Sequence, residues 1–201
     1  MTLEKEDYKE EQRNKVLAGA LECFAQKGYE GATIDDIVNE SGVSKGSIYK
    51  LFKSKEEIYF QLMSQNSKEL MDEINAVISK HTSALDKLTA LFTEYLGREV
   101  NSKVFKSFLV QSEFELFSSR REDLRELLEE RRRAKVNIIS DVIHEGINNG
   151  EFRKEIDITV HADIFWSYMH GNITHKILYP DLPYQELVNG QKESFLKKIR
   201  K

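Results

Sequence analysis

Residues 33–55 constrain the fold more than any other stretch, because they specify two short helices and the tight turn between them. Thr33 offers a side-chain oxygen to the first helix, and Asp36 lies three positions later, which is the spacing of a capping box. An apolar stripe at helical spacing follows, formed by Ile34, Ile37 and Val38. Gly42 then marks the turn, where glycine adopts a positive φ without a Cβ clash.

The second helix of this stretch has one apolar face and one polar, basic face. Ser44 is its candidate N-cap. The apolar face follows i, i+3, i+4 spacing and consists of Ile48, Leu51 and Phe52. The remaining arc carries Lys45, Gly46, Ser47, Tyr49, Lys50 and Lys53. This is the build of a helix-turn-helix, whose second helix lies in the major groove of DNA.

Several positions in and around this stretch agree in register with one known pattern, and they are Thr33, Ile37, Gly42-Val43-Ser44, Gly46, Tyr49, Phe52 and Ser54-Lys55-Glu56. The pattern resembles the DNA-binding segment of TetR-family transcriptional regulators. Lys9 to Gly28 is similar to the first helix of that family, with a buried face of Leu17, Ala20, Leu21 and Phe24. Val38 and Ser41 stand where the family commonly has alanine, and both are small changes that shift packing only slightly.

The resemblance implies a particular set of contacts with a double-stranded DNA operator. We expect Lys45 and Ser47 to approach base edges, while Gly46 lets the backbone come close to DNA. Helix N-termini favour phosphate, so Thr33 and Lys55 are expected to grip the DNA backbone. Tyr49 is expected to do the same, and the predicted interface is completed by Ser44 and Lys50.

The charge distribution matters more than the net charge of −4, which argues against a wholly basic nucleic-acid binder. Residues 41–55 contain four lysines and no acidic residue. The run from Glu4 to Glu11 is acidic, and we expect it to be solvated or disordered. The alternative for the lysine cluster is an ordinary solvated helix face.

Other features of the composition indicate a cytoplasmic protein. No apolar run approaches the ~20 residues of a membrane span, and no charged-then-apolar leader is present at the N-terminus. Cys23 is the single cysteine, so no intramolecular disulfide can form, and its place in the first-helix pattern favours a small buried core residue.

The rest of the chain reads as helical. Apolar residues recur at helical spacing in the segments 55–80, 84–97, 102–118, 121–149, 157–178 and 184–199. The two prolines, Pro180 and Pro183, separate the last two segments. We therefore expect an all-α fold with a three-helix DNA-binding head at 9–55 and a helical ligand-binding and dimerisation domain at 56–201.

The sequence contains no recognisable catalytic motif. None of the five histidines lies in an HExxH motif, and no GxSxG, Walker loop or GxGxxG sequence occurs. The chain is not expected to be an enzyme, and no cofactor or metal site is indicated.

The resemblance also implies a C-terminal domain that binds a small-molecule effector. Two segments mix large apolar groups with a few polar ones, and the candidate ligand-binding residues are Phe108, Gln111, Phe114, Glu115, Trp166, Met169 and His170. Such walls suit an apolar or amphipathic ligand held by a few polar contacts. An ionised Glu115 would favour a cationic ligand, and a neutral or acidic lipid-like molecule fits otherwise. The alternative is that these aromatic residues simply fill the core.

Together these observations favour a homodimeric repressor that a small ligand releases from a palindromic operator. The resemblance implies that the helices at 157–178 and 184–199 pair with those of a second copy. An activator, or a regulator that binds DNA only with its ligand, is the alternative within this class. A helical ligand-binding or interaction protein without specific DNA binding is the alternative from another class, and a helical enzyme is a distant third.

Overall fold

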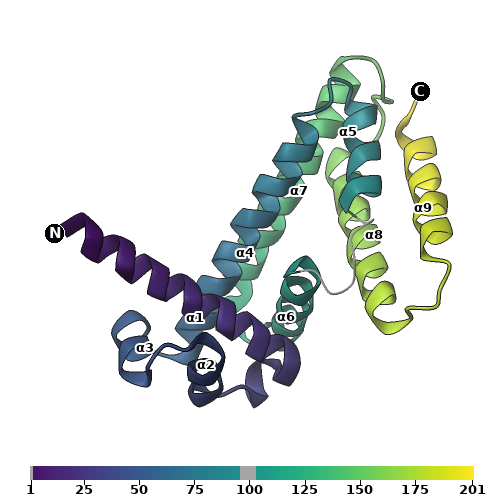
Figure 1. Cartoon of the computed structure of the whole chain (residues 1–201). Helices are drawn as coiled ribbons and strands as arrows, with labels where there is room; N and C mark the ends of the chain where they lie inside the picture. Colours follow the sequence, from purple (N-terminus) through teal and green to yellow (C-terminus); the bar gives the residue numbers. More distant parts are fainter. Residues whose placement is uncertain (1, 96–102) are drawn as a thin grey trace. The chain divides into compact units, whose positions relative to one another are not determined.

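The computed structural model describes residues 2–95 and 103–201, and the regular elements within these residues are helices (Figure 1). The first four are α1 (Thr2–Gly31), α2 (Ile34–Ser41), α3 (Lys45–Leu51) and α4 (Lys55–Ile78). They are followed by α5 (Ala84–Ala90), the π-helical turn η1 (Leu91–Tyr95), α6 (Lys103–Ser118), the 3-10 turn η2 (Glu122–Leu124), α7 (Arg125–Asn148), α8 (Ile158–Leu178) and α9 (Tyr184–Ile199). The predicted all-α fold is confirmed.

The chain divides into two compact units, and α4 contributes to both of them. The head unit comprises Met1–Glu69 and Lys103–Glu122. The C-terminal unit comprises Leu70–Ser102 and Asp123–Lys201. The head unit thus contains α6 in addition to the helices of the predicted head at 9–55.

The core of the head unit is built from apolar faces at helical spacing. Leu17, Ala20, Leu21 and Phe24 of α1 are buried, as predicted for that face. Ile37 of α2, Ile48 of α3 and Ile58 of α4 are completely shielded from solvent. Their burial removes apolar surface from water, which is the main favourable term in folding. It also fixes which face of α3 is left for solvent.

Helix α6 is attached to the head unit by polar and aromatic contacts. The Tyr59 hydroxyl of α4 donates to the Val110 carbonyl at 3.1 Å, and the Tyr59 ring lies 4.2 Å from that of Phe114 between centroids. Lys106 of α6 forms an ion pair with Glu22 of α1 at 2.7 Å. These partners are separated by up to 84 residues in the sequence, so helical periodicity alone does not reveal them.

Helix α1 is longer than the predicted segment from Lys9 to Gly28. It begins at Thr2, so the acidic run is helical rather than disordered, and the side chains from Glu6 to Glu11 are exposed as a solvated run requires. Near its end the helix is broken at Gly28, whose φ of 71° lies in the region that favours glycine.

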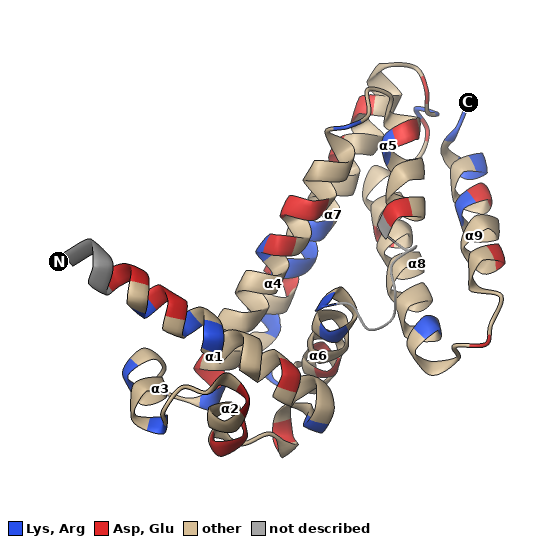
Figure 2. Cartoon of the chain, viewed as in Figure 1, with Lys and Arg blue, Asp and Glu red and all other residues tan. Residues whose placement is uncertain are grey.

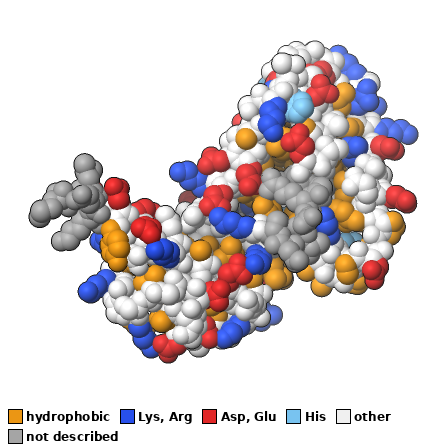
Figure 3. All heavy atoms as spheres, viewed as in Figure 1, with side chains coloured by type: hydrophobic (Ala, Val, Ile, Leu, Met, Phe, Trp, Pro, Cys, Tyr) orange, Lys and Arg blue, Asp and Glu red, His pale blue; other side chains and the backbone are white. Residues whose placement is uncertain are grey.

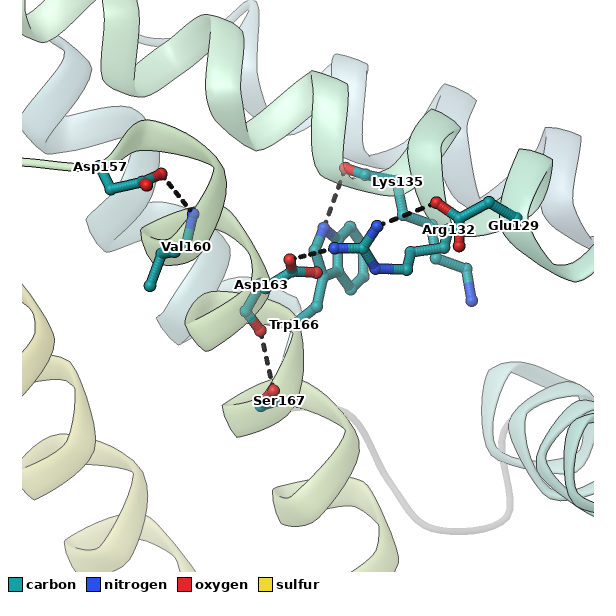
Figure 4. Close-up of polar contacts among 8 residues, drawn as sticks. All are labelled: Glu129, Arg132, Lys135, Asp157, Val160, Asp163, Trp166 and Ser167. Carbon is teal, nitrogen blue, oxygen red and sulfur yellow. Dashed lines mark hydrogen bonds and ion pairs between the residues drawn. The ribbon is translucent and has the colours of Figure 1, made fainter.

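The C-terminal unit is held together by the packing of α7 against α8. Ile139 and Ile143 of α7 and Phe165 of α8 are buried in its core. Arg132 of α7 forms an ion pair with Asp163 of α8, and the Trp166 indole donates to the Lys135 carbonyl at 2.9 Å (Figure 4). These polar contacts lie at the edge of the apolar core and fix the alignment of α7 with α8.

Candidate DNA-binding interface

The turn between α2 and α3 follows the predicted chemistry. Gly42 has a φ of 67°, and its N–H donates to the Val38 carbonyl at 3.0 Å, which ends α2 in a left-handed cap. The Ser41 hydroxyl accepts from the Val43 N–H at 3.2 Å. Val43 itself is buried and fills the joint between the helices. The angle at which α3 leaves the turn is therefore fixed by local bonds.

A capping box starts α2, which confirms the predicted relation of Thr33 and Asp36. The Thr33 hydroxyl accepts from the Asp36 N–H at 3.1 Å, and the Asp36 carboxylate accepts from the Thr33 N–H at 2.9 Å. Lys27 of α1 donates to the same carboxylate at 2.6 Å. The bonds from Lys27 and Thr33 lower the pKa of Asp36 from 3.8 to about 2.

Helix α3 turns its apolar side inward and leaves its polar side in solvent. Ser44 caps the helix by accepting from the Ser47 N–H at 3.2 Å. Ile48 and the following Phe52 are buried. The exposed arc is made of Lys45, Gly46, Tyr49 and Lys50, with Ser47 half-buried beside them. This arrangement leaves a polar face of α3 exposed, as a helix that enters a major groove requires.

The local charge around α3 is positive although the chain as a whole is acidic. Figure 2 shows basic and no acidic positions on α3, with acidic positions on the adjacent α2. On the face of the molecule seen in Figure 3, charges of both signs are spread over the head unit. Attraction of a DNA strand must therefore arise from the local lysines, because the net charge is −4.

The predicted lysines differ in whether they form ion pairs within the described part of the chain. Lys45 forms an ion pair with Asp35 at 2.8 Å, and this hydrogen-bonded carboxylate raises the pKa of Lys45. Lys50 and Lys53 are exposed, and neither has an ion pair with another residue of the described ranges. Contact between Lys45 and a base edge would therefore compete with Asp35, whereas Lys50 is available to DNA.

Lys55 lies in a different environment from the other predicted DNA contacts. Its ammonium group donates to the carbonyls of Tyr29 at 2.6 Å, Ala32 at 2.9 Å and Glu30 at 3.4 Å. It also lies 4.5 Å from the centre of the Tyr29 ring, within cation–π range. These contacts hold the end of α1 against the start of α4. The phosphate contact of Lys55 stays a prediction, and it would have to compete with them.

A groove beside α3 contains residues that the sequence reasoning did not select. It has a volume of about 590 Å³ and is lined by Glu6, Tyr8, Lys9 and Gln12 of α1 with Ser47, Lys50 and Leu51 of α3. Ser47 and Lys50 were predicted to contact DNA, whereas the α1 residues of the groove were given no role in binding. Tyr8 is an exposed aromatic residue preceding the apolar pattern of α1, which is the signal in the sequence that points to it.

The predicted ligand-binding residues fall in two sets, one in each unit. In α6, Phe114 is buried in an aromatic cluster with Tyr59 and Phe60, and Gln111 donates to Glu115 at 2.6 Å. Phe108 is half-buried on the same helix. In α8, Trp166 and Met169 are buried, and the His170 ring lies 6.3 Å from the indole. Each set contains the predicted mix of apolar and polar groups, and its role in binding stays a prediction.

Comparison with known proteins places this helical arrangement in a family. A family model described as bacterial regulatory proteins, tetR family, matches residues 16–62. A second, the tetracyclin repressor-like C-terminal domain, matches residues 90–181. The HTH-type transcriptional regulator YfiR of Bacillus subtilis is 30% identical over 175 residues, which cover 87% of this chain and 84% of that protein.

The chain belongs to the TetR family.

Other TetR-family relatives agree with this assignment. The HTH-type transcriptional repressor KstR2 of Mycolicibacterium smegmatis is 28% identical over 148 residues, covering 73% of this chain and 70% of that protein. A TetR transcriptional regulator from Chloroflexus aurantiacus shares the fold, with a TM-score of 0.81 and 23% identity over 96% of this chain and 98% of that one. TetR-family proteins are DNA-binding transcriptional regulators rather than enzymes, as the sequence predicted.

No helix among residues 2–95 and 103–201 has the length and apolar character to cross a membrane. Within the same ranges, no group of three or more histidine, cysteine, aspartate or glutamate side chains is arranged to hold a metal ion.

Proposed function

We propose that this TetR-family regulator is a repressor that a small apolar or amphipathic ligand releases from a palindromic operator. The observation that carries the proposal is the exposed polar face of α3, held by the caps at Thr33 and Ser44 and by the Gly42 turn. KstR2, a relative over most of the chain, is a transcriptional repressor. In this proposal Lys45 and Ser47 read base edges, while Thr33, Tyr49 and Lys50 contact phosphates.

A homodimer is part of the proposal, because a palindromic operator presents two half-sites. Two copies of α3 would then lie one turn of DNA apart, about 34–36 Å. The surface of the C-terminal unit supports this, since four large apolar side chains at α8 and just after it are exposed, and these are Val160, Leu178, Tyr179 and Leu182. A two-fold contact that runs along α8 and past its end would bury these side chains on both copies.

The oligomeric state tests the dimer. Leu178→Glu should shift the sedimentation of the chain from dimer to monomer and weaken operator binding. Leu116→Glu, which changes an exposed leucine in α6, is the matched control and should leave the dimer intact. A Leu178→Glu chain that sediments as a folded dimer would show that the contact lies elsewhere.

The candidate effector-binding residues are proposed as two apolar walls, one on α6 in the head unit and one on α8 in the C-terminal unit. Ligand binding would favour a state of the dimer with the wrong spacing of the two α3 helices. The ligand must then weaken operator affinity by the same factor by which the operator weakens ligand affinity. This reciprocity distinguishes a release mechanism from competition for the DNA surface.

The decisive experiment is selection of bound sites from genomic fragments, followed by fluorescence anisotropy on the selected operator. Lys45→Ala should relax the preference at one operator position by about 1–3 kcal/mol. Lys68→Ala, which changes an exposed lysine of α4, is the control and should leave the preference unchanged. Failure of the chain to enrich any site would contradict the proposed function.

A further inference from the structure

The contacts between α4 and α6 define which face of α4 is turned toward α6 in the head unit. Tyr59 donates to the Val110 carbonyl near one end of the contact, and Lys103 donates to the Glu69 carboxylate at 2.6 Å near the other. The two helices therefore run antiparallel. Asn66 lies seven residues after Tyr59 and three before Glu69, so all three residues share this face of α4.

Asn66 is buried without the hydrogen bonds that its amide requires. The residue is 7% exposed, and neither its oxygen nor its nitrogen has a hydrogen-bond partner within the described part of the chain. Leu62 and Met63, one helical turn earlier, are also buried and offer no polar group. A carboxamide can accept through its oxygen and donate twice through its nitrogen, and burial without partners is unfavourable.

Other buried polar groups of the described residues differ from Asn66. Asn172 has an unpaired oxygen, but its nitrogen donates to Gln191. Ser118 has a single hydroxyl near the end of α6, and such a group can turn toward a carbonyl of the preceding helical turn. In Asn66 a donor and an acceptor are both unsatisfied. A leucine of similar size would avoid this loss, so the amide calls for a partner beyond the described residues.

We infer that Asn66 is a polar anchor of the effector site and that the effector carries a neutral hydroxyl or amide group on an apolar body. The inference rests on the proposed function, in which a small molecule controls operator binding. A hydroxyl or amide offers both a donor and an acceptor, which matches the two unsatisfied atoms of Asn66. A carboxylate or ammonium group brings a charge that the uncharged amide does not neutralise, and its desolvation opposes binding.

The stability of the unliganded protein gives the first test. Asn66→Leu should raise the Tm of the full chain by about 2–6 °C, because it removes unsatisfied polar atoms from an apolar environment. Asn75→Leu changes an exposed asparagine of the same helix and is the control, for which little change is expected. A fall in Tm confined to Asn66→Leu would show that the amide has partners in the folded chain, and would overturn the inference.

The second test measures the binding of three probes with the same hydrocarbon chain: 1-octanol, octanoate and octylammonium. The wild-type chain should bind 1-octanol more tightly than either ion. Asn66→Leu should bind 1-octanol about tenfold more weakly than the wild type, which is roughly the value of one good hydrogen bond. Asn75→Leu should lose none. The conservative Asn66→Gln variant should lose less than Asn66→Leu, since it keeps both polar atoms.

The remaining outcomes overturn the inference in separate ways. Equal 1-octanol affinity in the wild type and in Asn66→Leu would mean that the amide holds only a buried water. Tighter binding of either ion would assign the effector to a charged class, and no binding of 1-octanol by the wild type would remove the hydroxyl class. Operator binding is measured on every variant, so its absence in the wild type would contradict the proposed function, whereas intact binding limits the failure to Asn66.

Discussion

The helix-turn-helix and the C-terminal unit are stabilised by contacts of very different sequence range. In the helix-turn-helix, Thr33 bonds to Asp36 and Ser44 bonds to Ser47, each three residues away. In the C-terminal unit, the bond from Trp166 to Lys135 joins residues 31 positions apart. The DNA-reading element is thus specified largely by its own short sequence, while the C-terminal helices depend on correct packing against one another.

The largest effect is expected where two helices of the C-terminal unit approach closely. A Cβ atom at Gly146 would lie 2.2 Å from the Phe152 ring and 2.9 Å from the Ala84 Cβ, so one of these groups must move. Gly146→Ala should lower the free energy of unfolding by about 3 kcal/mol through overpacking. Chemical denaturation measures this change.

Gly31→Ala is the matched control, because a Cβ there makes only an ordinary contact with the Lys27 side chain at 3.7 Å. We expect that variant to unfold at nearly the wild-type denaturant concentration. If Gly146→Ala were equally neutral, the close packing around Phe152 would not be a constraint on the C-terminal unit, and the contrast with the locally specified helix-turn-helix would fail.

Lys50 and Lys55 separate DNA contact from structural contact within the head unit. Lys55→Met should lower the free energy of unfolding by about 2 kcal/mol, because a charged donor to the Tyr29 and Ala32 carbonyls is lost. Lys50→Met should leave stability unchanged and reduce the slope of log affinity against log salt by about one unit. Anisotropy titrations at several salt concentrations, with denaturation of the same proteins, measure both.

A reduced salt slope for Lys55→Met with unchanged stability would reverse this assignment. It would show that the ammonium group leaves the carbonyls of α1 when DNA binds. The phosphate contact first expected for Lys55 would then hold in the complex.

A smaller effect is expected from the cap of α3. Ser44→Ala should lower the free energy of unfolding by about 1 kcal/mol, because the Ser47 N–H loses its side-chain acceptor and keeps only the Ser44 carbonyl. Ser44→Asn should recover most of this loss, since asparagine is an equally good N-cap. Comparable destabilisation by both substitutions would indicate that the cap contributes little and that packing of Ile48 determines the helix start.

The smallest effect concerns the acid stability of the α2 capping box. The pKa of Asp36 is lowered from 3.8 to about 2, so its contribution is present above pH 4 and is lost as the pH falls through about 2. Asp36→Asn should flatten the pH dependence of stability between pH 4 and pH 2. Glu40→Gln, an exposed acid at the other end of α2, should retain the wild-type dependence. A wild-type pH profile in Asp36→Asn would exclude the carboxylate as the titrating group.

The amino-acid sequence by itself determined the helix-turn-helix in detail. The capping box at Thr33, the left-handed Gly42 and the cap at Ser44 were all predicted and are all present. The buried face of α1 and the burial of Cys23 were predicted as well. These features could be predicted because a cap or an amphipathic helix depends on residues one or two turns apart, and that spacing is visible in the sequence.

Only the tertiary structure decided the attachment of α6 to the head unit, the contact of Lys55 with the end of α1, and the burial of Asn66 without a hydrogen-bond partner among the described residues. Lys55 lies 26 residues from Tyr29, and Tyr59 lies 51 residues from Val110. Periodicity identifies which face of a helix is apolar, but not the helix against which that face packs. The distant partners are chosen by the joint packing of all the helices, which no local pattern encodes.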